Sequence, residues 1–279
     1  MTDALIRISR GLWRPAHALS SPDDHARALL DVCPPGTVVA DLTAARWHGF
    51  WLPEASGQRV DVVVHGAESF PRDHPASRRP ELRARRRRLI DEDVCFRDGV
   101  WMTTPERTWV DLAQVLRYPD LVAAGDSALR LGVSVDALAS AVARARRQRG
   151  VVRARQAVLA LDARSRSRGE SHLRCAVTAP GAPIPQVNVA VYDADGGWLG
   201  EPDLSYDDVR LALEYNGADH AAPDRMRRDI TRELDFENRG GWRVLVFGPA
   251  EVFGRPWEVA ATVARVRAER QHRFARVVR

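Results

Sequence analysis

Apolar and polar residues alternate along residues 209–215, which is the pattern of a β-strand with one buried face. Three apolar residues share that face: Val209, Leu211 and Leu213. Because successive side chains of a strand point to opposite faces, Glu214 falls on the other face. Asp203 lies on a short segment before this strand, and residues 207–208 favour a turn between the two. The pattern predicts a hairpin that brings Asp203 and Glu214 to one end.

These two carboxylates have the chemistry of a metal site. Hard cations such as Mg²⁺ prefer oxygen ligands, and one or two carboxylates commonly hold them together with water and substrate phosphate. Asp203 and Glu214 supply such oxygens. The alternative is that Asp203 caps a turn and Glu214 pairs with an arginine, because most acidic side chains are solvated. The hairpin alone leaves both interpretations open.

The segments around the hairpin alternate between helical and strand patterns. Glu170 lies at helical spacing with Leu173 and Val177, so it faces the apolar side of a helix and needs a buried partner. Four further elements are predicted: strands over 184–192 and 242–248, and helices from Pro223 and over 257–270. The strand over 242–248 has a near-continuous apolar run, which predicts burial. Glu170 becomes a candidate third member of the carboxylate site.

The N-terminal half carries the signals of short helices and one hairpin. A helix is predicted over residues 22–31, where prolines follow its end. Thr43 is predicted to cap a second helix, and Thr104, followed by Pro105, to cap a third. Residues 98–99, an Asp-Gly pair, predict a hairpin turn.

Residues 78–90 form the densest basic run of the chain. In a strand the alternation of this run is too poor to bury one side, which predicts that it is at least partly exposed. Two interpretations follow, a solvated positive surface or a surface that contacts phosphate. The candidate DNA patch has four members: Arg85, Arg86, Arg87 and Arg88.

Composition narrows the class of protein. A chain of 279 residues with 45% apolar residues predicts two domains with real cores. The net charge of +5 permits a nucleic-acid partner, although all 42 basic residues are arginine, which indicates a codon bias. The start of the sequence is not a secretory segment and no long apolar run follows, so we expect a soluble, cytoplasmic protein without a membrane partner. Three scattered cysteines are expected to be buried free thiols: Cys33, Cys95 and Cys175.

An ordered series of N-terminal segments resembles the AbiEi-type antitoxin family. The series is ISRGLWRP, LTAARWHGFWLP, VDVVV, the arginine-rich run and VWMTTPERTWVDLA. The resemblance covers residues 1–135 and implies an α+β domain. In that family a winged helix usually precedes these segments, and residues 6–13 resemble the last strands of its wing. Most of the winged helix is therefore expected to be missing from this domain, and its recognition helix with it.

A second series, after a helical Arg-rich connector over residues 136–168, resembles the DUF559 domain. It consists of GESHLR, IPQVNVAV, EPDLSYDDVRLALEYNGADH and DRMRRDITRELDFENRGGWRVLVFG. That family belongs to the very-short-patch-repair-like branch of the PD-(D/E)xK nucleases. Over residues 169–279 it implies a restriction-endonuclease-like mixed sheet flanked by helices, within an α/β class overall. It also implies that Asp203, Glu214 and the Tyr215 carbonyl hold Mg²⁺ or Mn²⁺, while Glu170 orders a metal-bound water.

The same resemblance suggests roles for residues beyond the hairpin. His220 would orient water or protonate the leaving oxygen, and Arg228 and Arg232 would hold the substrate phosphate. Asn216 stands where the superfamily has its lysine, so this chain lacks that positive charge.

The sequence thus supports two functional hypotheses. The first is a metal-dependent endonuclease-like protein that hydrolyses DNA phosphodiesters in defence, repair or a toxin-antitoxin pair. The alternative is a weakly active or inactive protein that binds nucleic acid or a cognate toxin and keeps the nuclease fold as a scaffold. The oligomeric state is not set by the sequence.

Overall fold

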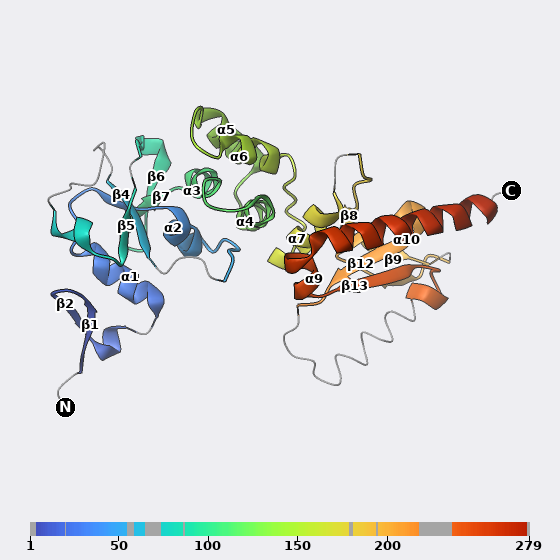
Figure 1. The fold of residues 1–279 in the computed structure, drawn as a ribbon, viewed down its shortest axis with the longest axis horizontal. Coiled ribbons are helices and arrows are strands. Elements are labelled where there is room, and N and C mark those ends of the chain that lie inside the picture. Colours follow the sequence, from blue (N-terminus) through green and yellow to red (C-terminus); the bar gives the residue numbers. More distant parts are fainter. Residues whose placement is uncertain are drawn as a thin grey trace. The chain divides into compact units, whose positions relative to one another are not determined.

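The structure, a computed structural model, describes residues 4–19, 21–54, 59–64, 74–85, 87–178, 181–193, 195–217 and 236–277. The chain forms two compact units (Figure 1). The N-terminal unit contains residues 1–121 and 131–159, and the C-terminal unit contains residues 122–130 and 160–279. Among the described helices, none combines the length and apolar character needed to cross a membrane.

A five-stranded mixed sheet forms the centre of the N-terminal unit, in the order β5-β4-β3-β7-β6. In chain order its strands are β3 (Thr37–Val39), β4 (Val60–Val64), β5 (Leu82–Ala84), β6 (Val94–Arg97) and β7 (Val100–Thr103). The pairs β3-β4 and β6-β7 are antiparallel, whereas β3-β7 and β4-β5 are parallel. Val39, Val62 and Met102 are almost completely buried, so this sheet carries much of the unit's core.

Helices and a small hairpin complete the described part of this unit. The helices are α1 (Pro22–Leu30), α2 (Asp41–His48), α3 (Pro105–Leu112), α5 (Val135–Arg144) and α6 (Val151–Val158). The hairpin joins β1 (Leu5–Ser9) to β2 (Leu12–Pro15), and three short 3-10 turns are η1 (Ala16–Ala18), η2 (Pro75–Arg78) and η3 (Asp91–Asp93).

Local signals in the sequence predicted the positions of several of these elements. The helix over residues 22–31 is confirmed as α1, and Thr104 caps α3 with Pro105 at its first turn as predicted. The turn at residues 98–99 joins β6 to β7. The prediction for Thr43 is wrong, because α2 begins at Asp41 and the Thr43 hydroxyl instead accepts a hydrogen bond from the Asp61 amide over 2.9 Å.

The C-terminal unit contains a four-stranded sheet in the order β13-β12-β11-β8. Its strands are β8 (Gln186–Val187), β11 (Leu204–Tyr206), β12 (Leu211–Tyr215) and β13 (Arg243–Phe247), and a separate ribbon pairs β9 (Val191–Tyr192) with β10 (Trp198–Gly200). The helices are α7 (Arg168–Val177), α9 (Pro249–Gly254) and α10 (Pro256–Val277), with η4 (Asp207–Val209) between β11 and β12. Helix α4 (Tyr118–Arg130) contributes its residues 122–130 to this unit.

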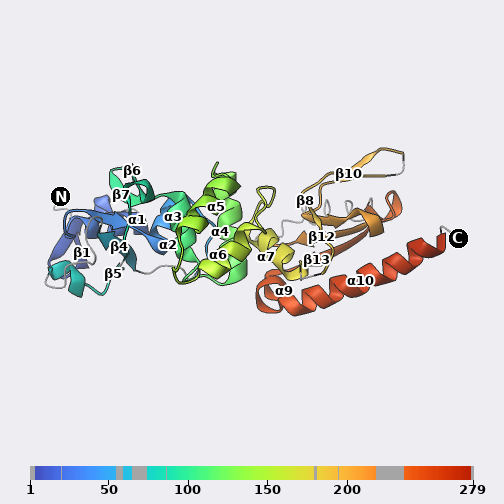
Figure 2. The ribbon, with the colours of Figure 1, turned by 90° about the horizontal axis from the view of Figure 1, so that it is seen from above.

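The two faces of the C-terminal sheet bury different sets of side chains. Leu211 and Leu213 pack in one cluster with Leu173 of α7 and with valines of α10, and Figure 2 shows α10 running along the sheet. Ala212 belongs to a second cluster on the opposite face, with Phe236 and Trp242. Val209, Leu211 and Leu213 share one buried cluster, as predicted. The strand itself begins at Leu211, with Val209 in η4, and the opposite face is also buried at Ala212 instead of polar.

Two predictions for this unit need correction, and one falls outside the described residues. Strand β13 is partly exposed rather than buried, with Val246 44% exposed, because it lies at the edge of the described sheet. Helix α10 is longer at both ends than the predicted 257–270. The helix predicted from Pro223 lies outside the described residues. The mixed α/β architecture is confirmed, while the restriction-endonuclease-like form of the C-terminal sheet stays a prediction.

Candidate functional site

The β11-β12 hairpin positions two of the predicted site residues. The strands are antiparallel with Leu204 opposite Leu213, so Asp203 and Glu214 come to the same end of the pair, as predicted. At this end the Tyr215 amide donates a hydrogen bond to the Asp203 carboxylate over 2.7 Å. Asp203 thus has a structural partner in the backbone of the neighbouring strand.

Glu170 reaches the same region from the first turn of α7. Its side chain is 7% exposed, and its Oε2 accepts hydrogen bonds from the Arg166 amide and from Asn188 Nδ2, each over 2.8 Å. The Asn188 amide in turn donates to the Asp203 carbonyl over 3.0 Å. Asn188 therefore links the α7 carboxylate to the hairpin, and sequence reasoning did not single it out. Its signal was only an Asn within a predicted strand, where polar residues are uncommon.

Asn188 has two further unusual features. Its φ of +47° lies in the left-handed region, which Asn tolerates better than most residues. Its Oδ1 is buried and has no hydrogen-bond partner among the described residues. Such an atom costs free energy unless a donor or a cation meets it.

The described residues do not assemble the metal centre that the sequence predicts. Glu170, Asp203 and Glu214 supply suitable oxygens, but no group of three or more His, Cys, Asp or Glu side chains in the described ranges is arranged to hold a metal ion. At least one oxygen of Glu170 and one of Asp203 is engaged by the protein's own N–H groups. A role of these residues, with the Tyr215 carbonyl, in holding Mg²⁺ or Mn²⁺ stays a prediction.

The remaining predicted residues of this site are placed only in part. Asn216 is exposed, and its amide donates to the Phe247 carbonyl over 2.9 Å, continuing the β12-β13 pairing. His220, Arg228 and Arg232 lie outside the described residues.

In the N-terminal unit, the basic run meets buried aspartates. Asp61 of β4 lies opposite Arg83 of β5, and Arg83 Nη2 donates to its carboxylate over 2.8 Å. Two residues further, Arg85 Nε donates to Asp41 over 3.1 Å, and Arg87 Nη1 donates to the other Asp41 oxygen over 2.5 Å. Asp41 and Asp61 are both 0% exposed. Every second arginine from Arg83 to Arg87 therefore places its guanidinium group on a buried aspartate, although only Arg83 lies in β5.

The ion pairs continue into α3. Arg87 Nη1 lies 2.9 Å from the Asp111 carboxylate, which also accepts a 2.9 Å hydrogen bond from Arg107 Nε. Arg107 Nη1 donates to Asp93 over 2.8 Å. Eight residues form this alternating ion-pair chain: Arg83, Asp61, Arg85, Asp41, Arg87, Asp111, Arg107 and Asp93.

The ion-pair chain changes the interpretation of the basic run. The run is partly exposed, as expected, with Arg88 exposed and Arg85 32% exposed, but the Arg87 side chain is only 9% exposed. The apolar pattern did not predict this burial, because the partners of the arginines are aspartates of β4, α2 and α3. Arg88 is exposed, and Arg86 lies outside the described residues. Phosphate contact by this patch stays a prediction, and Arg88 is its most accessible described member.

Burial shifts the pKa values of two aspartates in the ion-pair chain. Burial raises the pKa of Asp61 above its ordinary value, against the opposing hydrogen bond from Arg83. Burial likewise raises the pKa of Asp111, which Arg87 and Arg107 oppose. Because four arginines match four aspartates, the group is neutral overall and ties strands β4 and β5 to helices α2 and α3. Removing one member would leave a buried charge without its partner.

Comparison with known proteins identifies the part of the chain that contains this network. Residues 38–160 match the family model of the AbiEi antitoxin C-terminal domain. Two proteins of Mycobacterium tuberculosis, "Uncharacterized protein MT2308" of strain CDC 1551 / Oshkosh and "Uncharacterized protein Rv2248" of strain ATCC 25618 / H37Rv, are each 31% identical over 265 residues, covering 94% of this chain and 92% of theirs. The chain belongs to one family with these proteins. Its residues 38–160 form an AbiEi-like domain, called the AbiEi domain below.

The match confirms the predicted AbiEi-like region, but it covers residues 38–160 instead of the predicted 1–135. The AbiEi domain takes in residues 136–160, which the sequence assigned mainly to a connector. No solved structure matches the chain significantly. The resemblance of the C-terminal unit to DUF559 stays a prediction.

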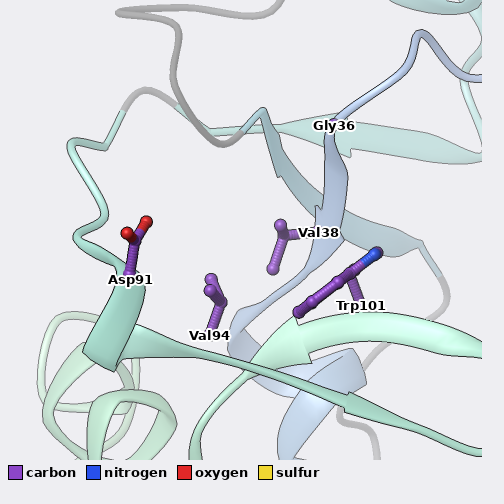
Figure 3. Close-up of a pocket in the computed structure, with 5 residues that line it drawn as sticks. All are labelled: Gly36, Val38, Asp91, Val94 and Trp101. Carbon is purple, nitrogen blue, oxygen red and sulfur yellow. The ribbon is translucent and has the colours of Figure 1, made fainter.

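Two surface pockets lie in the described part of the N-terminal unit. One, of about 270 Å³, opens between Val38, Val94 and Trp101, with Asp91 at its border (Figure 3). Trp101 is 51% exposed and packs against the ring of Phe96 at 5.2 Å between centroids. The second, of about 180 Å³, lies where the ion-pair chain ends at Asp93 and Arg107. Its wall includes two exposed arginines, Arg88 and Arg144.

Proposed function

We propose that this protein is an antitoxin-like protein that binds nucleic acid, recognising it through the AbiEi domain and keeping the C-terminal unit as a scaffold that does not cut. The toxin-antitoxin context rests on the family match over residues 38–160. The observation that carries the non-cutting part is the way Glu170 and Asp203 are held. Both carboxylates accept hydrogen bonds from protein N–H groups, in a region without a described three-ligand cluster.

The charge of the chain supports a polyanionic partner. A net charge of +5 attracts nucleic acid without sequence preference, and neutralising phosphates releases counterions, so such binding weakens steeply with salt. In the ion-pair chain, aspartates pair with Arg83, Arg85 and Arg87. The exposed Arg88 is therefore the arginine of this segment that is best placed to contact phosphate.

Two experiments test this proposal. The purified chain should bind duplex DNA with an affinity that falls as salt is raised, and its co-expression with the product of an adjacent gene should relieve growth inhibition by that product. Asp203→Ala should retain both properties, because the C-terminal carboxylates are not used. Absence of DNA binding by the wild-type chain at low salt would contradict the nucleic-acid part of the proposal.

The second candidate function is a metal-dependent endonuclease acting on DNA. The observation that favours it is the buried Asn188 Oδ1, an oxygen without a described partner beside Glu170 and the Asp203 strand. A divalent cation would supply an activated water and offset charge on the phosphate. If this function holds, isothermal titration with Mn²⁺ should show stoichiometric binding that Asp203→Ala and Asn188→Leu abolish. Equal heats for all three proteins would exclude it.

A further inference from the structure

We propose that the pocket between Arg88 and Arg144 in the AbiEi domain is a site for a phosphate ester of a sugar, the unit that nucleic-acid backbones and free nucleotides share. The inference rests on the proposed nucleic-acid binding and assigns it to a specific pocket. The pocket is formed by the segment after β5, by the start of α3 and by the end of α5 with the turn that follows.

Two arginines give this pocket its positive charge. Arg88 and Arg144 line it, both are exposed, and neither forms an ion pair with any residue that the structure describes. They differ in this from Arg85 and Arg87, whose guanidinium groups contact buried aspartates. Because a guanidinium presents donors in a planar fork, two of them on one pocket can hold the oxygens of a phosphate.

The acidic residue in the pocket wall does not cancel this charge. Asp93 accepts a hydrogen bond from Arg107 Nη1 over 2.8 Å, and Arg107 also lines the pocket. The Asp93 carboxylate is 9% exposed, as is the side chain of Arg107. Asp93 is therefore neutralised within the ion-pair chain, and the positive charge of Arg88 and Arg144 is left for a ligand.

Gln148 adds a hydrogen-bond acceptor to the wall of the pocket. Its side chain lines the pocket, and its Oε1 is buried with no hydrogen-bond partner in the described part of the chain. Its backbone amide donates to the Ala145 carbonyl over 3.1 Å, which holds the residue in the turn after α5. An acceptor that lacks a donor is satisfied by a hydroxyl group. A ribose attached to the phosphate supplies one, whereas the sugars inside a DNA backbone lack the 2′-hydroxyl and have their 3′ and 5′ oxygens esterified.

The size and the remaining wall of the pocket agree with this ligand. Its volume of about 180 Å³ is below the roughly 300–1,000 Å³ of pockets that enclose a drug-sized molecule, so it takes one unit of a larger ligand. Ile90, Val110 and Ala141 form an apolar part of the wall, against which the carbons of a sugar ring would pack. The chemistry is thus phosphate at one end and hydroxyl and carbon at the other.

The test compares three probes: inorganic phosphate, a mononucleotide and a short duplex DNA. Each is titrated against the full chain, against Arg88→Ala with Arg144→Ala, and against Gln148→Leu. The matched control is Arg10→Ala with Arg155→Ala, which removes the same charge from two exposed arginines that do not line the pocket. Melting temperatures of all variants show whether each protein is folded.

We expect the double pocket variant to lose about tenfold or more in affinity for the duplex or the mononucleotide, because a hydrogen bond to a charged group contributes roughly 1.5–3 kcal/mol. Its salt slope for the duplex should fall by roughly one for each phosphate that the variant no longer binds, while the control keeps affinity and slope. With a ribonucleotide as the mononucleotide probe, Gln148→Leu should weaken its binding more than it weakens binding of the duplex, whose internal sugars have no free hydroxyl. Mononucleotide binding points to a free nucleotide as the source, and binding of the duplex alone points to a backbone.

Equal losses of affinity in the pocket and control variants, or no loss in either, would overturn the inference while leaving nucleic-acid binding intact. If the wild-type chain does not bind the duplex but binds the mononucleotide through Arg88 and Arg144, the proposed function fails and the pocket stands. If none of the three probes binds the wild-type chain, both fail.

Discussion

Arg83 lies directly opposite Asp61 in the parallel pairing of β4 with β5, and its Nη2 donates to the Asp61 carboxylate over 2.8 Å. Asp61 is 0% exposed, so this ion pair begins the ion-pair chain inside the unit instead of on its surface. The densest basic run of the sequence is in this way partly an internal feature of the AbiEi domain. Arg83, Arg85 and Arg87 hold secondary-structure elements together through buried aspartates, whereas Arg88 is exposed.

The ion-pair chain predicts a large loss of stability on breaking one link. Asp111→Asn removes the charge that faces both Arg87 and Arg107, and we expect the free energy of unfolding to fall by about 3–5 kcal/mol. Urea denaturation of the full chain measures it. The control is Asp98→Asn, which breaks an exposed pair with Arg97 and should cost less than about 1 kcal/mol. Similar losses of unfolding free energy for the two variants would show that the ion-pair chain stabilises the protein no more than an exposed ion pair does.

Gly169 predicts a specific steric conflict in the C-terminal unit. A Cβ added at this position of α7 would lie 2.1 Å from Cε1 of Tyr215, the residue whose amide binds Asp203. We expect Gly169→Ala to destabilise the protein by roughly 1–3 kcal/mol. Gly254→Ala at the end of α9 meets no atom within 4 Å and should stabilise by up to about 1 kcal/mol. A thermal melt in which Gly169→Ala gains stability would show that the Tyr215 ring moves away without cost.

Asn188 predicts that Glu170 has a structural role. Asn188→Ala removes the donor to Glu170 and the 2.8 Å hydrogen bond to the Arg164 carbonyl, and it places Ala in a left-handed conformation. A loss of roughly 2 kcal/mol in unfolding free energy is expected. Gln186→Ala, in the same strand region but exposed, serves as the control and should change stability by less than about 0.5 kcal/mol. Equal losses of unfolding free energy in Asn188→Ala and Gln186→Ala would mean that the hydrogen bonds of Asn188 do not stabilise the protein.

His48 predicts a pH dependence of stability. Its Nε2 contacts the Thr103 carbonyl over 2.8 Å, and burial lowers its pKa below the ordinary 6.5. Between the lowered pKa and 6.5 the unfolded chain binds more protons than the folded one, so this contribution to stability is full above 6.5 and is lost as the pH falls through that window. Unfolding free energies across this range should fall with decreasing pH in the wild type and less in His48→Gln. If the unfolding free energy changes equally with pH in both proteins, groups other than His48 cause the pH dependence.

Periodic and local signals in the sequence predicted much of the fold. The alternation over residues 209–215 placed Leu211 and Leu213 on one face, and Thr104 with Pro105 marked the start of α3, because both signals depend on neighbours in the chain. The partners of Arg85 and Arg87 could not be read in this way, since Asp41 and Asp111 are distant in sequence and their burial depends on tertiary packing.

The candidate site was predictable to a similar extent. The hairpin register brought Asp203 and Glu214 together as expected, because pairing follows from the turn. Asn188 was missed, since nothing in a single sequence marks a left-handed Asn that links a helix to a strand. The pocket of Arg88, Arg144 and Gln148 joins residues from separate segments that only the fold brings together.

Binding of duplex DNA without cleavage can be measured in a single assay. Labelled duplex DNA is incubated with the wild-type chain or with Asp203→Ala in the presence of Mg²⁺ or Mn²⁺, and binding and strand integrity are recorded on the same samples. We expect equal, salt-sensitive binding by both proteins, with the duplex intact. Cleavage by the wild-type chain that Asp203→Ala abolishes would contradict this expectation.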